Sequence, residues 1–124
     1  MKRILIVDDA ATVRMYYRSI LEAGGYEVDE AINGVEALER ALQYPYSLFV
    51  VDVNMPTLDG YGFLRELRRQ ELPQVPAIMI SSESKDSDRE LAYAAGASLY
   101  LVKPSKPEQL LFNVQLLIGA AEAP

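Results

Sequence analysis

Leu48-Phe49-Val50-Val51-Asp52 is a run of four apolar residues that ends in an acid, and Ile4-Leu5-Ile6-Val7-Asp8 has the same form. Ala77-Ile78-Met79-Ile80 and Leu99-Tyr100-Leu101-Val102 are two further apolar runs. Runs that are apolar throughout are typical of parallel strands that helices cover on both faces. A fifth run, Glu27-Val28-Asp29-Glu30-Ala31, is more polar, and we expect it at an edge of the same sheet.

Amphipathic segments follow each of these runs and predict five helices. The signals for their ends are Gly24-Gly25 after the first, a capping box at Asn33-Gly34-Val35-Glu36, Asp59-Gly60 before the third, Asp86 and Gly96 around the fourth, and Pro107 in the first turn of the fifth. The predicted core-facing positions are Val13, Tyr17, Ile20, Leu21, Val35, Leu38, Leu42, Leu64, Leu67, Leu91, Ala94, Ala95, Leu110, Leu111, Val114 and Leu117. Strand and helix alternate five times, which predicts one α/β domain with right-handed crossovers, and residues 119–124 are expected to form a tail.

Composition excludes several classes of function. The net charge is −6 and the basic residues are scattered, so direct binding of nucleic acid is not expected. The chain has neither Cys nor His, which excludes disulfides, thiolate or imidazole metal sites, and a phosphohistidine within this chain. No stretch approaches the roughly 20 apolar residues of a membrane span. We expect a cytoplasmic protein whose chemistry uses carboxylates, hydroxyls, lysine and a hard metal ion.

Polar side chains stand at the end of four of the predicted strands. Asp8 and Asp9 end the first, Asp52 the third, Ser81 the fourth and Lys103 the fifth. Ligands of open α/β sheets bind beyond the carboxyl ends of the strands, so these groups are expected to converge. Two carboxylates about 5 Å apart repel by roughly 3 kcal/mol at an effective dielectric constant near 20. Such a cluster calls for a cation or a useful pKa shift, and oxygen ligands favour Mg²⁺.

Each residue of this cluster also has a simpler explanation. Asp8 and Asp9 are suited to capping the helix that follows them. Asp52 is compatible with a turn after its strand, and Lys103-Pro104 with a surface turn. These explanations weaken together, because they give no reason for all the groups to share one sheet edge.

Five motifs occur in order along the chain. They are Val7-Asp8-Asp9 with Arg14, Asp52-Val53-Asn54-Met55-Pro56 with Asp59-Gly60, Met79-Ile80-Ser81, Gly96-Ala97, and Tyr100-Leu101-Val102-Lys103-Pro104. The combination resembles the receiver domain of bacterial two-component response regulators, particularly the stand-alone chemotaxis type, over essentially the whole chain. The resemblance implies a single receiver domain over residues 1–124. It also implies a flavodoxin-like three-layer sandwich of five helices around five parallel strands in the order 2-1-3-4-5.

The resemblance also implies roles for individual residues. Asp52 would be the phosphoacceptor, and Mg²⁺, or Mn²⁺ in its place, would bind Asp9, Asp52 and the backbone carbonyl of Asn54, with Asp8 acting largely through water. Lys103 would pair with the phosphoryl oxygens. Ser81 would turn inward to the phosphoryl group, and Tyr100 would follow from an exposed to a buried position. The Lys103–Pro104 bond is a candidate cis peptide.

Partners follow from the same resemblance. The phosphodonor would be a sensor histidine kinase, and the domain would promote phosphoryl transfer to its own Asp52 and later hydrolysis without being an enzyme in the ordinary sense. Phe112 and Leu116 lie opposite the core-facing stripe of the last helix and, with Tyr100 and the fourth helix, predict a face for a downstream protein or a weak phosphorylation-dependent dimer.

Other functions stay open from the sequence. A Mg²⁺-dependent phosphatase with an aspartyl-phosphate intermediate usually has a second Asp where this chain has Asn54, and it commonly has a cap domain as well. A flavodoxin-like nucleotide-binding domain needs a glycine-rich loop, whereas Asp8-Asp9-Ala10-Ala11-Thr12 is acidic and lacks glycine. A receiver-like module without phosphotransfer is a third alternative, and a receiver cut from a longer regulator is a fourth.

Overall fold

A computed structural model describes residues 2–103 and 105–121, and it contains the five strands and five helices that the sequence predicts. The strands are β1 (Arg3–Val7), β2 (Glu27–Ala31), β3 (Leu48–Asp52), β4 (Ala77–Ser81) and β5 (Leu99–Val102). The helices are α1 (Ala11–Ala23), α2 (Gly34–Gln43), α3 (Gly60–Arg69), α4 (Asp86–Ala95) and α5 (Pro107–Ile118). Among the described residues, no helix has the length and apolar character needed to cross a bilayer.

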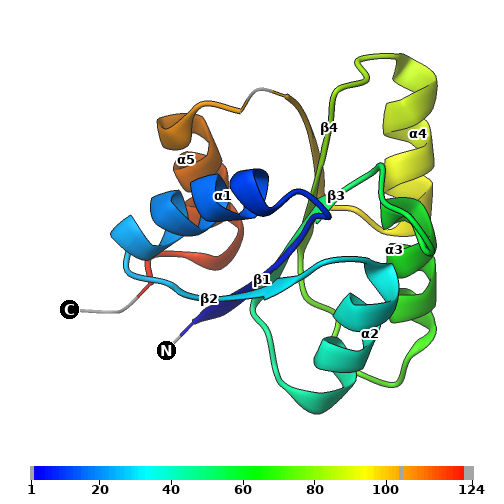
Figure 1. Cartoon of the computed structure of the whole chain (residues 1–124), viewed down its shortest axis with the longest axis horizontal. Coiled ribbons are helices and arrows are strands. Elements are labelled where there is room, and N and C mark those ends of the chain that lie inside the picture. Colours follow the sequence, from blue (N-terminus) through cyan, green and yellow to red (C-terminus); the bar gives the residue numbers. More distant parts are fainter. Residues whose placement is uncertain (1, 104, 122–124) are drawn as a thin grey trace.

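All the strand pairs are parallel, and the sheet has the order β2-β1-β3-β4-β5 (Figure 1). The more polar strand β2 lies at an edge, as the sequence predicts. Helices α1 and α5 cover one face of the sheet, and α2, α3 and α4 cover the other (Figure 1). The three layers of the predicted sandwich are therefore confirmed.

The core consists of one hydrophobic cluster on each face of the sheet. The cluster under α1 and α5 includes Leu21, Leu110 and Val114, all fully buried. The cluster under α2, α3 and α4 is larger and includes the aromatic pair Phe49 and Phe63, whose ring centroids lie 5.7 Å apart. Because both faces of β1, β3 and β4 are covered, these strands need the continuous apolar character seen in the sequence.

The predicted orientation of α2 and α4 is wrong in part. Val35, Leu42 and Leu91 are expected in the core, but their exposed fractions are 42%, 53% and 51%, and Ala94 is also exposed. Small residues are buried instead, namely Gly34, Ala37 and Ala41 in α2 and Ala92 and Ala95 in α4. Small side chains let these helices lie close to the sheet, so the larger residues beside them point outward.

The capping box that opens α2 is confirmed in a slightly altered form. The Asn33 Oδ1 atom accepts a hydrogen bond of 2.8 Å from the Glu36 backbone N–H. The Glu36 carboxylate accepts in return from the Ile32 N–H at 3.2 Å, one residue before the N-cap. Both bonds satisfy backbone donors at the start of the helix, which stabilises its first turn.

The predicted tail is partly packed onto the domain. The Tyr26 hydroxyl donates a hydrogen bond of 2.6 Å to the Gly119 carbonyl, Lys2 Nζ donates to the Ala120 carbonyl at 2.7 Å, and Ala121 is buried. Residues 119–121 therefore belong to the folded unit. Residues 122–124 and Pro104, with its candidate cis peptide, lie outside the described residues.

The outer edge of β2 is covered in one place by a side chain. Arg18 of α1 donates from Nη2 to the Val28 backbone carbonyl at 2.7 Å. The same guanidinium lies 3.3 Å from the Glu30 carboxylate. Arg18 thus ties α1 to the edge strand.

Candidate functional site

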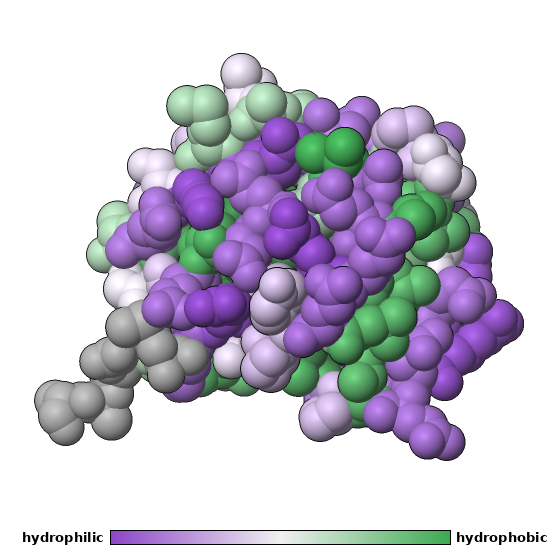
Figure 2. Space-filling model, turned by 60° about the horizontal axis from the view of Figure 1, so that its bottom comes forward, coloured by the Kyte–Doolittle hydropathy of each residue, from purple (hydrophilic) through white to green (hydrophobic). Residues whose placement is uncertain are grey.

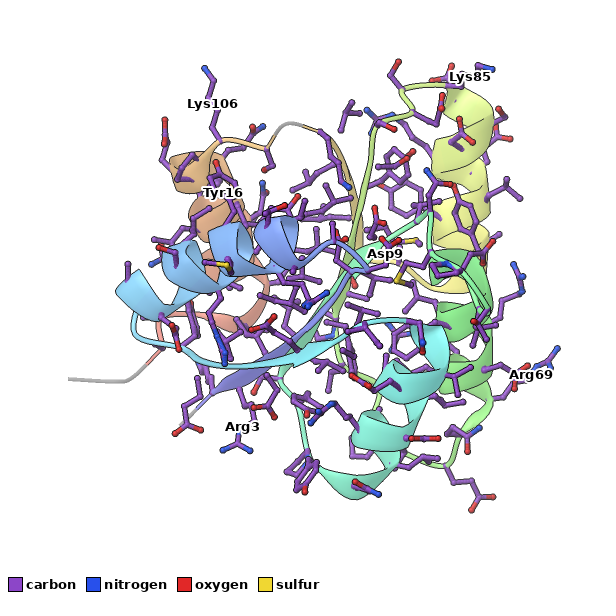
Figure 3. The ribbon with its side chains drawn as sticks, in the orientation of Figure 1. Arg3, Asp9, Tyr16, Arg69, Lys85 and Lys106 are labelled. Carbon is purple, nitrogen blue, oxygen red and sulfur yellow. The ribbon has the colours of Figure 1, made fainter. Side chains whose placement is uncertain are left out.

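Three carboxylates converge at the carboxyl ends of the central strands. Asp8 follows β1, Asp9 comes next to it, and Asp52 is the last residue of β3. One oxygen from each lies within 4.8 Å of the others. Asp9 is exposed and lies just beyond the end of β1, between α1 and the helices on the other face of the sheet (Figure 3), whereas Asp8 and Asp52 are buried. The sequence prediction that these three residues come together is confirmed.

One lysine faces the carboxylates. Lys103, directly after β5, donates from Nζ to Asp52 Oδ1 at 2.9 Å and lies 3.8 Å from Asp8 Oδ2. The first distance is a charge-assisted hydrogen bond and the second is too long to be one. Lys103 thus pairs with Asp52 itself, a contact that the sequence does not predict because only its pairing with a phosphoryl group is expected.

The electrostatic balance of this acidic site favours a further cation. Asp8 Oδ1 accepts a hydrogen bond from the Ala10 N–H at 2.9 Å, as a capping role predicts, but the buried Asp8 Oδ2 has no hydrogen-bond partner among the described residues. Burial, together with the nearby Asp52 charge, raises the pKa of Asp8 to about 6. Burial also raises the pKa of Asp52, although Lys103 acts in the opposite direction. An all-oxygen donor set with an unsatisfied carboxylate oxygen fits a hard divalent ion.

Arg14 positions the loop that carries Asp8 and Asp9. Its guanidinium donates from Nη1 to the Asp8 backbone carbonyl at 2.8 Å and from Nε to the Glu30 carboxylate at 2.7 Å. Arg14 thereby connects the β1–α1 loop to the end of β2. The sequence gives Arg14 as part of a motif without a role, because the partner Glu30 lies in another element.

The loop after Asp52 is held by a close approach of the backbone. Gly60 donates a hydrogen bond of 2.9 Å to the Val53 carbonyl, and a Cβ atom at Gly60 would lie 2.4 Å from the Asp52 carbonyl oxygen. Only glycine fits at this position. Thr57 has a φ of 72°, and the Leu58 N–H bonds across it to the Pro56 carbonyl at 2.8 Å, which makes a γ-turn. The exposed Asn54 lies within this loop, two residues after Asp52.

The two predicted switch residues meet at Glu83. The buried Ser81 Oγ accepts a hydrogen bond of 3.1 Å from the Glu83 N–H, and the Tyr100 hydroxyl donates to the Glu83 carbonyl at 2.7 Å. The Arg89 guanidinium lies 5.2 Å from the centroid of the Tyr100 ring. Tyr100 is 3% exposed, so the expected exposed resting position is not the one found here. The hydrogen bond to Glu83 and the Arg89 contact hold the ring inward.

The remaining predicted face lies on α5. Phe112 and Leu116 are 63% and 68% exposed, as expected. Since Tyr100 is buried, it adds little surface to this face.

Comparison with known proteins decides the family. The family model described as "Response regulator receiver domain" matches residues 4–115, which include all three clustered acids and Lys103. This chain belongs to the response regulator receiver domain family. Receiver domains are signalling domains of two-component systems, so the family that the sequence motifs suggest is confirmed.

Solved receiver domains share the fold closely. The chemotaxis response regulator CheY4 of Vibrio cholerae is 35% identical, with a TM-score of 0.89 over 94% of this chain and 98% of that one. The receiver domain of sensor histidine kinase PA1611 from Pseudomonas aeruginosa is 33% identical, with a TM-score of 0.88 over 96% of this chain and 98% of that one. That second structure has a magnesium ion coordinated in its active-site cleft.

Curated relatives of this receiver domain are longer. The transcriptional regulatory protein ResD of Bacillus subtilis is 35% identical over 96% of this chain and 49% of its own length. The probable transcriptional regulator ycf27 of Cyanophora paradoxa is 40% identical over 99% of this chain and 51% of its own length. The chain thus spans about half the length of these relatives.

Proposed function

We propose that this receiver domain is a phosphoacceptor switch in which Asp52 takes a phosphoryl group from a sensor histidine kinase. The observation that carries the proposal is the cluster of three carboxylates within 4.8 Å that faces a single lysine. Asp9, Asp52 and the Asn54 backbone carbonyl would hold Mg²⁺ or Mn²⁺ directly, and Asp8 would hold it largely through water. The ion supplies positive charge beside the phosphoryl oxygens. A cytoplasmic location is part of the same proposal.

The transfer itself is a substitution at phosphorus. An Asp52 carboxylate oxygen forms the new bond, the bond between phosphorus and the imidazole nitrogen of the donor's phosphohistidine breaks, and that nitrogen keeps the electron pair. Lys103 Nζ, already 2.9 Å from Asp52, compensates the charge that collects on the phosphoryl oxygens. Phosphorylated Asp52 carries about two negative charges beside two other carboxylates. Without cations nearby, this repulsion would disfavour the product.

Ser81 and Tyr100 transmit the change in this proposal. The Ser81 hydroxyl exchanges its Glu83 partner for a phosphoryl oxygen, a contact that unmodified Asp52 does not offer in the same way. The Tyr100 hydroxyl donates to the carbonyl of the same Glu83. Movement of Glu83 therefore alters the packing between β5, which carries Tyr100, and α4. A ligand or modification shifts a conformational equilibrium only through such differential contacts.

The phosphoacceptor is tested by mass. The protein is incubated with Mg²⁺ and acetyl phosphate and then weighed intact, and we expect a gain of one phosphoryl group that Asp52→Asn abolishes. Asp59→Asn is the matched control, because Asp59 caps α3 through Oδ1 at 2.8 Å from the Gly62 N–H and asparagine caps equally well. Labelling that survives in Asp52→Asn overturns the proposal, and turnover of many equivalents of a phosphate ester favours a phosphatase instead.

The ion is tested without phosphorylation. Titration calorimetry with Mg²⁺ should give binding that Asp9→Asn and Asp52→Asn each remove and Asp59→Asn retains. Binding that survives in both cluster variants contradicts the proposed ligands.

The output is proposed at the α5 face. Phe112 and Leu116 would contact a downstream protein or a second copy of the phosphorylated chain. Sedimentation velocity of the phosphorylated protein tests the second copy, and Phe112→Ser with Leu116→Ser should abolish any dimer. Met15→Ser on α1, where the side chain is 66% exposed, is the control. A dimer unchanged by the double substitution rejects this face.

Two arrangements of the output remain as proposals. The likeness to CheY4 supports a stand-alone chemotaxis-type regulator, as the sequence motifs suggest. The longer transcriptional regulators support a receiver followed by an output domain, in which case that domain and not this one contacts DNA. The mass of the native protein in its own cells separates them, because a value well above 13.8 kDa requires further chain.

A further inference from the structure

A pocket lies at the opposite end of the sheet from the acidic site. It has a volume of about 360 Å³, which is within the range of small-molecule sites. The end of α2, the start of β3, the end of α3 and the segment before β4 surround it. Hydrophobic side chains form a continuous strip on the face that Figure 2 brings forward, and polar residues flank the strip.

The walls of this apolar pocket are mostly hydrophobic. Phe49, Leu67 and Ala41 form its buried part, while Leu42 and Tyr44 stand at its rim with exposed fractions of 53% and 47%. The large exposed side chains at the rim cost free energy in water unless something covers them.

One charged side chain lines the pocket. Arg68 is half-buried, and its guanidinium donates to the Gly96 carbonyl at 2.9 and 3.2 Å and to the Gln74 side-chain oxygen at 3.2 Å. Both partners are neutral, and none of the described lining residues is acidic. Burial lowers the pKa of Arg68, because it removes water from the charged guanidinium. No acidic lining residue among those described compensates for this loss. Three donor bonds leave two of its five N–H groups for another acceptor.

We propose that this apolar pocket binds a small amphipathic carboxylate, whose apolar body lies against Phe49 and Leu67 and whose carboxylate pairs with Arg68. Charge complementarity selects this class of ligand, because the pocket offers apolar contact and one cation that has no acidic partner among the described residues. The proposal is independent of phosphorylation, since the pocket and the acidic site lie at opposite ends of the strands.

The test compares two probes with the same naphthyl body, one of which carries a carboxylate and the other a neutral amide of similar size. 1-Naphthaleneacetate and the neutral 1-naphthaleneacetamide are titrated into the ¹⁵N-labelled full chain, and chemical-shift changes of the backbone amides are followed. We expect changes centred on residues 41–49 and 67–75, with the acid binding about tenfold more tightly than the amide because of its charge-assisted hydrogen bonds. Equal affinities, or changes centred elsewhere, overturn the proposal even if no variant is made.

Substitutions then locate the charge. Arg68→Gln should weaken binding of the acid about tenfold and leave the amide unchanged. Arg69→Gln is the matched control, since it removes the same charge one residue later from a side chain that is 71% exposed and points away from the protein (Figure 3). Equal losses in the two variants indicate a general effect of net charge and overturn the proposal. Asp52→Asn should bind the acid like the wild type, which separates this result from the fate of the phosphoacceptor.

Discussion

The two ends of the parallel sheet carry unbalanced charges of opposite sign. Among the described residues, Lys103 is the one cation that pairs with the cluster of Asp8, Asp9 and Asp52 at the carboxyl ends of the strands, and a buried carboxylate oxygen there has no hydrogen-bond partner. At the amino ends of β3 and β4, the half-buried Arg68 lines an apolar pocket, and its hydrogen-bond partners within the described part of the chain are neutral. The core between the two ends is apolar, and the unbalanced charges lie where strands and helices end.

Binding is expected at both ends of the sheet, where charged groups lack a counterpart among the described residues. A buried charge without an opposite charge is costly, and a protein that keeps one gains from a ligand that balances it. The acidic site calls for a cation, and the apolar pocket calls for an anion.

The largest effect is expected at Lys103. Lys103→Gln removes the cation that lies 2.9 Å from Asp52 Oδ1, and the rate of phosphorylation by acetyl phosphate should fall by about 100- to 1,000-fold. Intact mass at a series of times measures the rate. Binding of 1-naphthaleneacetate at the other end should not change. A rate within a factor of two of the wild type shows that Lys103 has no part in the transfer.

A smaller effect concerns pH in the absence of metal. The pKa of Asp8 is about 6 in the folded protein against 3.8 in a free side chain, so between these values the folded form binds more protons than the unfolded form. The free energy of unfolding should therefore fall by about 2–3 kcal/mol as the pH rises from about 4 to about 6. Urea unfolding across this range measures it.

Asp8→Asn supplies the control for this pH dependence. It removes the titrating group, so the variant should lose less stability over the same range and exceed the wild type at pH 7 without metal. Added Mg²⁺ should stabilise the wild type more than the variant. Parallel pH profiles for the two proteins would show that Asp8 carries no such penalty.

A substitution at Gly96, which contacts Arg68, tests the end of the sheet that carries the apolar pocket. Its φ is 112°, and a Cβ atom there would lie 2.7 Å from Arg68 Cγ. Gly96→Ala should lower the free energy of unfolding by about 1–2 kcal/mol and displace the Arg68 side chain, with phosphorylation preserved. Thermal unfolding and the naphthaleneacetate titration check the two parts. A variant as stable as the wild type contradicts the geometry of this turn.

The smallest effect is expected at Leu42. The sequence predicts this residue in the core, but the structure places it at the rim of the apolar pocket. Leu42→Gln should change the free energy of unfolding by less than about 0.5 kcal/mol, whereas Leu64→Ala, in the core, should cost about 2–5 kcal/mol. A large loss in Leu42→Gln would restore the sequence prediction.

Strand-end chemistry could be predicted from the sequence because parallel strands all end at one edge. A polar residue at the end of an apolar run needs no knowledge of tertiary packing to be placed there, and Asp8, Asp52 and Ser81 lie where this rule puts them. Helix ends could also be predicted, because they depend on residues close together in the sequence, as the Asn33 cap of α2 shows.

Features that depend on packing between elements were not predictable. The outward turn of Leu91 follows from the alanines that bring α4 close to the sheet, and a periodic pattern does not say which of two adjacent stripes is buried. The inward position of Tyr100 depends on Glu83 and Arg89, which belong to other elements. The apolar pocket has no sequence motif, since its walls come from four separate segments.

The Arg18 contact at the edge of β2 has a consequence for solubility. An uncovered edge strand offers free carbonyl and N–H groups on which a strand of another chain can add, and this is how fibrils and other aggregates begin. Because Arg18 already occupies the Val28 carbonyl, an incoming strand would have to break that bond and displace a charged side chain. Arg18 thus makes the addition of a sixth strand from a neighbouring molecule less favourable at this point of the edge.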